Sequence, residues 1–200
     1  YGYYADGEAG GTPHGLKYVL NPQACLDLAA GGHDPLTISD ATAKAYADQY
    51  FEYDAEGRVS KLITGGGAQE TSYTYVESGF ADDRNHWKKK TTETRPDGTQ
   101  LVTYKNYMNQ VMLTDRIADG EHAIEYRRYD AAGNLILHAT ASAVESYSDT
   151  SADLDVQYKS DGGVQNVGVI HVYDYYSATD LPNGAVEGYK ACDKIQRGGA

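Results

Sequence analysis

Apolar and polar residues alternate along most of this chain, and a period of two residues is that of β-strands. Tyr73 and Tyr75 fall on one face of an expected strand over 71–76, and Tyr173 and Tyr175 repeat this spacing near the C-terminal end. Short clusters rich in Gly, Asp and Asn separate such runs and favour tight turns. The pattern therefore predicts a mainly β protein built of antiparallel hairpins.

The remaining strands follow from the same alternation, and one turn has a clear local cause. Pro96 presets φ for a turn, and Gly98 follows Asp97 at the position that tolerates positive φ. The further expected strands cover 1–4, 16–20, 50–53, 59–63, 87–94, 100–107, 111–114, 123–129, 135–137, 167–175 and 186–195.

Residues 21–48 break this pattern and predict a small helical insertion. Asn21 stands where a helix cap is expected, directly before a proline, and a helix over 23–30 follows. Ser39 caps a second, alanine-rich helix over 41–48. We expect this insertion to lie on the outside of the sheet or to close one of its ends.

Residues 139–166 are polar and rich in Ala, Ser and Asp. This composition predicts helix and loop, with a single helical turn over 142–147.

A seven-residue motif, Tyr-Asp-Ala-x-Gly-x-apolar, occurs twice at an offset of 76 residues. The tyrosine ends a strand, the aspartate bonds forward to its own backbone, the glycine takes a positive φ, and the apolar residue begins the next strand. Repeat units are expected near 46–64 and 122–138, and Asn109 marks a decayed third copy over 105–111. The signature residues are Tyr53, Asp54, Gly57 and Val59 in the first copy and Tyr129, Asp130, Gly133 and Leu135 in the second.

These two copies, YDAEGRV and YDAAGNL, resemble the YD repeat of the Rhs family of very large secreted or cell-surface proteins. In that family the repeats form long β-hairpins that wind into a spiralling sheet, often closed into a hollow shell. The likeness extends over 46–176 and implies that residues 1–200 are one continuous repeat segment of a larger extracellular protein. Flanking YD repeats or identical copies are the partners it implies, and free sheet edges favour such pairing. The self-cleaving carboxy-terminal core of some family members has no counterpart here.

The composition limits the classes of partner. The chain has nineteen tyrosines but only two phenylalanines and one tryptophan. Because the tyrosine hydroxyl tolerates solvent, this composition suits a sheet with one solvent-exposed face. A net charge of −12 gives no basic field for nucleic acid. The basic run at 88–90 is expected to be a solvated strand edge. No apolar stretch approaches the ~20 residues that a membrane-spanning helix needs.

Residue spacing predicts no catalytic, cofactor or metal site. Cys25 and Cys192 are 167 positions apart, which fits no metal or redox motif; a disulfide and two free thiols both remain open, and free thiols are the simpler expectation. Asp-Gly pairs at 97–98, 119–120 and 161–162 are interpreted as hairpin turns, because a calcium loop needs about six oxygen ligands. The scattered histidines, at His14, His33, His86, His122, His138 and His171, and the acidic pairs, at Asp82-Asp83 and Asp153 with Asp155, are interpreted as surface or strand residues.

The predicted function is structural: a scaffold segment of a shell, stalk or filament. A carbohydrate- or surface-binding adhesion module is the alternative, since sugars stack on aromatic rings such as Tyr73 with Tyr75 or Tyr173 with Tyr175. A third hypothesis, a lyase or glycosidase, requires a cleft with convergent acids.

Overall fold

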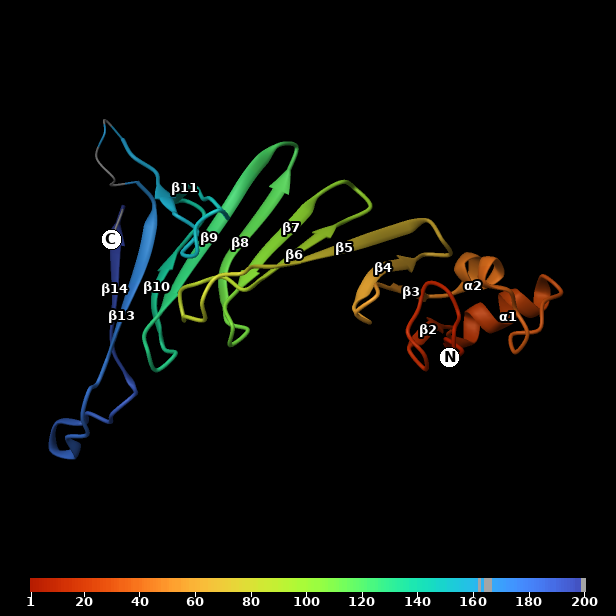
Figure 1. Cartoon of the computed structure of the whole chain (residues 1–200), viewed down its shortest axis with the longest axis horizontal. Helices are drawn as coiled ribbons and strands as arrows, with labels where there is room; N and C mark the ends of the chain where they lie inside the picture. The colour runs from red at the N-terminus through yellow and green to blue at the C-terminus, as the bar shows by residue number, and fades with distance from the viewer. Residues whose placement is uncertain (162, 164–166, 199–200) are drawn as a thin grey trace. The chain divides into compact units, whose positions relative to one another are not determined.

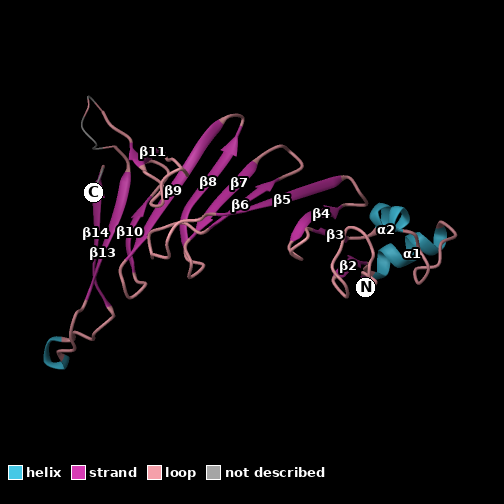
Figure 2. Cartoon of the chain, viewed as in Figure 1, coloured by secondary structure: helices cyan, strands magenta, loops and turns pink. Residues whose placement is uncertain are grey.

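The computed structural model describes residues 1–161, 163 and 167–198, and the chain is mainly β with two small helices (Figures 1 and 2). Among the described residues, twelve strands form one antiparallel sheet in the order β1-β2-β3-β4-β5-β6-β7-β8-β9-β10-β13-β14, and β11 and β12 form a small second sheet. Strands adjacent in sequence are nearly always adjacent in the sheet. This arrangement confirms the predicted array of antiparallel hairpins.

The chain divides into two compact units. The first unit contains residues 1–74 and 93–99, and the second contains residues 75–92 and those from 100 on. The element bounds are β1 Gly2–Tyr3, β2 Leu16–Val19, α1 Pro22–Ala30, α2 Asp40–Tyr46, β3 Gln49–Tyr53, β4 Val59–Thr64, β5 Gln69–Glu77, β6 Lys89–Thr94, β7 Gln100–Lys105, β8 Val111–Ala118, β9 Glu121–Tyr129, β10 Leu135–Ala139, β11 Val144–Ser146, β12 Gln157–Tyr158, β13 Val169–Tyr175, the 3₁₀ helix η1 Leu181–Asn183, and β14 Lys190–Arg197.

The helical insertion of the first unit forms where the capping residues predict it. The Asn21 side chain accepts a hydrogen bond from the Ala24 N–H at 2.8 Å, and Ser39 Oγ accepts one from the Thr42 N–H at 3.2 Å. Each bond satisfies a backbone donor that the first helical turn leaves without a partner. The helices lie beside β2 and β3 (Figure 1), and α2 packs on the sheet through a cluster of Ala43, Tyr50 and Ile63. The insertion therefore covers a face of the sheet, as expected.

The second unit holds the larger core. Buried residues alternate on β7 (Val102, Tyr104) and on β9 (Ile124, Tyr126). Leu113 of β8 is buried between Tyr104 and Tyr126, its partners in the pairing, so these residues mark the inner face of the three strands. The only tryptophan is buried here too: Trp87 makes edge-to-face contacts with Phe80 and Tyr104 at ring-centroid distances of 5.8 and 5.4 Å. Trp87 precedes β6, whereas the sequence predicted a half-exposed strand from this residue on.

The expected helical turn over 142–147 is wrong. Residues 144–146 form β11, which pairs antiparallel with β12. Val144 and Leu154 are buried in the core of the second unit, so burial of their side chains overrides the local preference of the surrounding Ala, Ser and Asp residues. Leu154 is fully buried at φ 68°, a left-handed conformation that is rare for a bulky residue.

The basic run 88–90 is not a solvated strand edge. β6 lies between β5 and β7 in the sheet. Lys88 Nζ lies 3.1 Å from an oxygen of Asp82, and Lys90 Nζ lies 2.8 Å from Asp149 Oδ2. Two of the three lysines are therefore half-buried partners of carboxylates.

Candidate functional site

The two signature corners share one hydrogen-bond pattern. In the first, the Asp54 N–H donates to the Arg58 carbonyl at 2.8 Å, and the Gly57 N–H donates back to the Asp54 carbonyl at 3.1 Å. Gly57 has φ 76°, which only glycine adopts without strain. The same two bonds, both 3.0 Å long, and a positive φ of 93° recur in the second corner, among Asp130, Gly133 and Asn134. The predicted corner geometry is confirmed.

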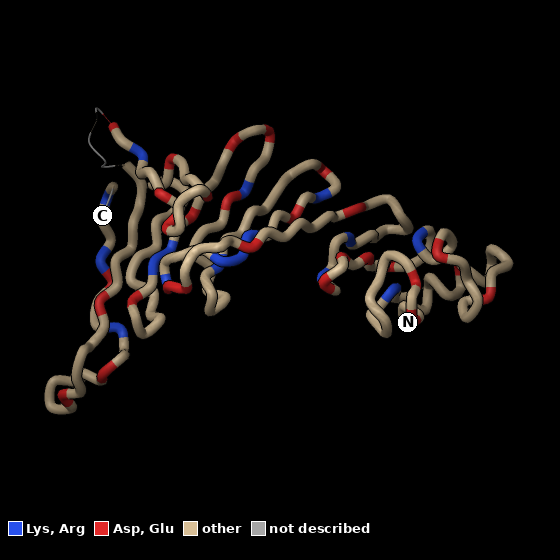
Figure 3. The backbone as a smooth tube through the Cα atoms, in the orientation of Figure 1, with Lys and Arg blue, Asp and Glu red and all other residues tan. Residues whose placement is uncertain are grey.

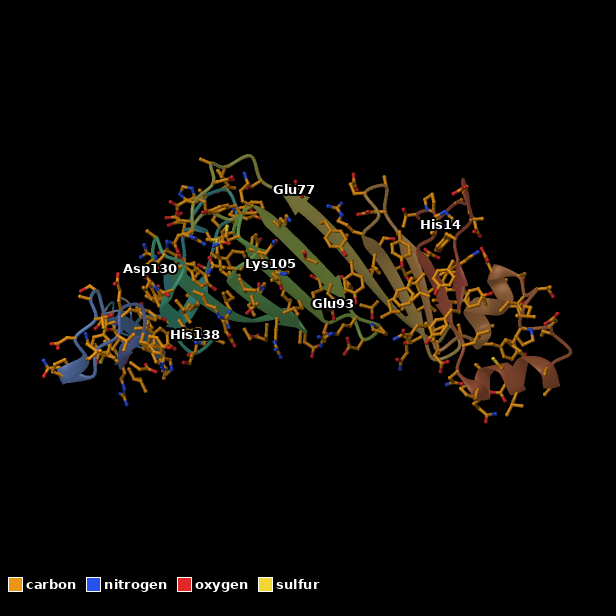
Figure 4. The ribbon with its side chains drawn as sticks, turned by 90° about the horizontal axis from the view of Figure 1, so that it is seen from below. His14, Glu77, Glu93, Lys105, Asp130 and His138 are labelled. Atoms are coloured by element: carbon orange, nitrogen blue, oxygen red, sulfur yellow. The ribbon has the colours of Figure 1, made fainter. Side chains whose placement is uncertain are left out.

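The decayed third copy has this geometry as well. The Asn106 N–H donates to the Gln110 carbonyl and the Asn109 N–H donates to the Asn106 carbonyl, each at 3.0 Å. Asn109 has φ 61°, as predicted for a residue in the place of the glycine. Here Asn106 replaces the signature aspartate and Lys105 replaces the tyrosine. Figure 4 labels Lys105 of this copy and Asp130 of the second corner.

The signature aspartate closes its corner from the side chain. Asp130 Oδ1 accepts the Asn134 N–H at 2.8 Å, and Asp54 Oδ1 accepts the Arg58 N–H at 2.9 Å. Burial by itself raises the pKa of Asp130, but the hydrogen bonds from Asn134 and the corner backbone outweigh burial and hold that pKa below its usual value. The aspartate therefore acts as an ionised cap of the turn.

The signature tyrosine bonds to the neighbouring strand. The Tyr53 hydroxyl donates to the Leu16 carbonyl at 2.8 Å, and the Tyr129 hydroxyl donates to the Val111 carbonyl at 2.8 Å. In both cases the tyrosine is the last residue of its strand and the acceptor is the first residue of the strand beside it. We call this bond the tyrosine clamp. Burial raises the pKa of both hydroxyls, so they remain protonated donors.

Tyr175 forms a third tyrosine clamp, which the sequence did not predict. Its hydroxyl donates to the Leu135 carbonyl at 2.9 Å, from the last residue of β13 to the first residue of β10. No signature aspartate follows Tyr175. The available signal was its position at the end of an alternating strand.

The two predicted aromatic faces differ in what surrounds them. Tyr73 and Tyr75 lie on β5 and are both half-buried, on either side of the boundary between the units. Tyr173 stacks on His171 at 6.1 Å and has Lys190 Nζ 5.0 Å from its ring centroid. A hollow of about 320 Å³ on the second unit is bordered by Leu135, Tyr173, Tyr175 and Lys190.

A polar cluster on the inner face of the second unit was missed altogether. Asp115, on β8, is fully buried. Its Oδ2 accepts a hydrogen bond from His122 Nδ1 at 2.7 Å and one from the Tyr147 hydroxyl at 3.2 Å. Its Oδ1 has no partner among the described residues. The signal available in the sequence was a charged residue at the inward position between Leu113 and Ile117.

A second carboxylate of this cluster is bound in the same way. Asp149 Oδ2 accepts from Lys90 Nζ at 2.8 Å and from the Tyr104 hydroxyl at 3.1 Å. The ammonium of Lys90 is the main cause that lowers the pKa of Asp149. The rings of Tyr104 and Tyr147 touch edge to face at 5.4 Å, which joins the two groups, and burial raises the pKa of both hydroxyls.

This cluster forms the wall of a pocket of about 450 Å³. Its lining residues come from the sheet strands β6, β7 and β9 and from β11 and the residues directly after it. The lining residues are Lys90, Tyr104, His122, Ile124, Glu145, Ser146, Tyr147, Ser148 and Asp149.

The other histidines and acids are placed as follows. His138, labelled in Figure 4, stacks on His171 across β10 and β13 at 6.0 Å, a pair that residue spacing did not predict. Asp82, Asp83, Asp153 and Asp155 are exposed. Within residues 1–161, 163 and 167–198, no group of three or more His, Cys, Asp or Glu residues is arranged to hold a metal ion.

The remaining predictions concern cysteines, turns and membrane spans. Cys25 and Cys192 are both free thiols. Asp119-Gly120 is a turn with positive φ at both residues, whereas Gly162 of the last Asp-Gly pair lies outside the described residues. In the described part of the chain, no helix has the length and apolar character to cross a membrane.

Comparison with known proteins gives no relative: the chain matches no model of a protein family and no curated protein.

Proposed function

We propose that this chain is a structural segment of an extracellular or cell-surface protein of the YD-repeat type, part of a shell, stalk or filament. The observation that carries the proposal is the recurrent tyrosine clamp, which joins each clamped strand to the strand beside it at the same position. Recurrent bonds of this kind are what a repeat protein needs, because each unit is stabilised mainly by its neighbour.

The corners support the same reading. The three corners of the repeat use one hydrogen-bond pattern, although one of them has neither the tyrosine nor the aspartate, and the turn from Arg95 to Thr99 uses the same pattern. The corners keep the same backbone geometry although their side chains differ. This suits a scaffold, because the function of each repeat unit is then its shape. The winding of the strands into a spiralling sheet or closed shell is part of this proposal.

The last strand of the sheet offers a surface for further units. β14 pairs with β13 on one side and with no other strand of the described chain. Ile195 is 69% exposed on it, and charged residues of both signs lie along β13 and β14 (Figure 3). An exposed strand edge pairs readily with another strand. We propose that flanking hairpins or identical copies add here.

Sedimentation velocity over a concentration series, with electron microscopy of the largest species, tests this assembly. Ile195→Lys places a charge on the edge and is expected to reduce the assembled fraction strongly. Leu36→Lys is the matched control, because Leu36 is 90% exposed in a loop outside the sheet and its replacement should leave assembly unchanged. A wild-type chain that stays monomeric throughout, or equal effects of both substitutions, contradicts assembly through β14.

A second candidate is an adhesion module, favoured by the hollow that Tyr173 and Tyr175 border. A glycan array tests it. Loss of a bound glycan in Tyr173→Ala supports the module, and an array without binding counts against it.

A further inference from the structure

We propose that the pocket on the second unit binds the ammonium group of a primary amine, such as a lysine side chain. This inference does not rest on the scaffold proposal, because the pocket is formed within one unit and needs no sheet edge. Its volume of about 450 Å³ lies within the range of pockets that hold small ligands.

The charges around the pocket favour a cation. Asp115, Glu145 and Asp149 contribute three carboxylates against the single ammonium of Lys90, so two negative charges are in excess when His122 is neutral. An anionic ligand is disfavoured by the same field. The carboxylate of Glu145 is exposed and makes no hydrogen bond or ion pair with any residue that the structure describes.

The burial of Asp115 adds a further observation on one of these three carboxylates. A fully buried carboxylate oxygen without a donor is costly, and such groups in native proteins call for an explanation. The other oxygen of this carboxylate holds His122 and Tyr147, both of which line the pocket, so Asp115 lies directly behind the pocket wall. Its negative charge favours a cation there, and the wall that it orients is held in place before any ligand arrives.

Lys90 shows that the surroundings accept an ammonium group. Its Nζ lies 2.8 Å from Asp149 Oδ2 and 5.4 Å from the centroid of the Tyr104 ring, so a carboxylate and an aromatic face already hold one cation. Asp149 already pairs with Lys90, whereas the carboxylate of Glu145 in the same lining has no such partner among the described residues and is left for a second cation.

The test compares two ligands that differ only in the ammonium group: Nα-acetyl-lysine amide and Nα-acetyl-norleucine amide. Binding to the full chain is followed by the emission of Trp87, which contacts Tyr104 of the pocket wall, and by calorimetry. We expect saturable binding of the lysine ligand and none of the norleucine ligand. Glu145→Gln should weaken the lysine ligand about tenfold, as expected for loss of a charged hydrogen-bond partner.

Glu187→Gln is the matched control, because Glu187 is equally an exposed glutamate of the second unit but does not line the pocket. Neither substitution touches the core, so both variants should fold. The proposal is overturned if the lysine ligand shows no saturable binding up to about 10 mM. It is also overturned if norleucine amide binds as well as the lysine ligand, or if Glu145→Gln has no greater effect than Glu187→Gln.

Discussion

Removing a single hydroxyl group tests the tyrosine clamp directly. Tyr129→Phe deletes the donor of the 2.8 Å hydrogen bond to the Val111 carbonyl and leaves the ring in place. A neutral hydrogen bond contributes about 1 kcal/mol net to stability, and a carbonyl left without its donor in a half-buried place adds to the loss. We therefore expect the free energy of unfolding to fall by ~1–2 kcal/mol. In a chain of 200 residues this lowers Tm by about 2–8 °C.

Urea unfolding followed by Trp87 emission measures this change in the second unit, because the chain has one tryptophan and it lies in that core. The control is Tyr189→Phe: Tyr189 is 70% exposed, and its hydroxyl bonds to no other described residue. It should change stability by no more than a few tenths of a kcal/mol, as surface substitutions usually do. If Tyr129→Phe is as stable as wild type, or if Tyr189→Phe loses as much, the clamp does not stabilise the hairpins.

Two further substitutions probe the third corner and the polar cluster. Asn106→Asp restores the signature aspartate but should lower the free energy of unfolding by ~1–3 kcal/mol. The cause is that Nδ2 of buried Asn106 donates a hydrogen bond to the Arg84 carbonyl at 2.7 Å, which a carboxylate cannot do. Chemical denaturation measures this change, and a gain in stability would refute it. Lys90 lowers the pKa of Asp149, so the stability from this pair is present above the unfolded pKa of about 3.9 and is lost as the pH falls through the lower folded pKa. Asp149→Asn should therefore flatten the decline of stability below about pH 4, measured by unfolding at several pH values, and an unchanged slope would count against the assignment.

The corners and caps were predictable because their causes are local. A glycine that needs positive φ, an aspartate that bonds forward, and an asparagine before a proline each act within about five residues, and all appear in the structure as expected. The sequence even predicted that Asn109 takes the place of the glycine in the third corner, because asparagine tolerates a positive φ better than other residues with a side chain.

The pocket and the β11–β12 pair were not predictable in the same way. The pocket wall forms only when β8, β9 and the segment after β11 pack on one another and bring together Asp115, His122 and Tyr147. The spacing of these residues in the sequence does not predict this contact. The segment 139–166 looked polar because its few apolar residues are isolated, yet Val144 and Leu154 are among the most buried in the chain. The tyrosine clamp lies between these cases: its residue was visible in the sequence, but its acceptor was not.

Leu154 combines full burial with a backbone that resists its side chain. The left-handed conformation costs ~1–2 kcal/mol for an L-residue with a Cβ, whereas removal of a buried leucine typically costs about 3–5 kcal/mol. A glycine here would relax the backbone and still lose on balance. Leu154 therefore anchors the later part of the segment between β11 and β12, whereas Tyr147 and Asp149 hold its start through hydrogen bonds. Withdrawal of the Leu154 side chain from the core would release the backbone toward its preferred conformation. Opening of the second unit is accordingly expected to begin at this segment.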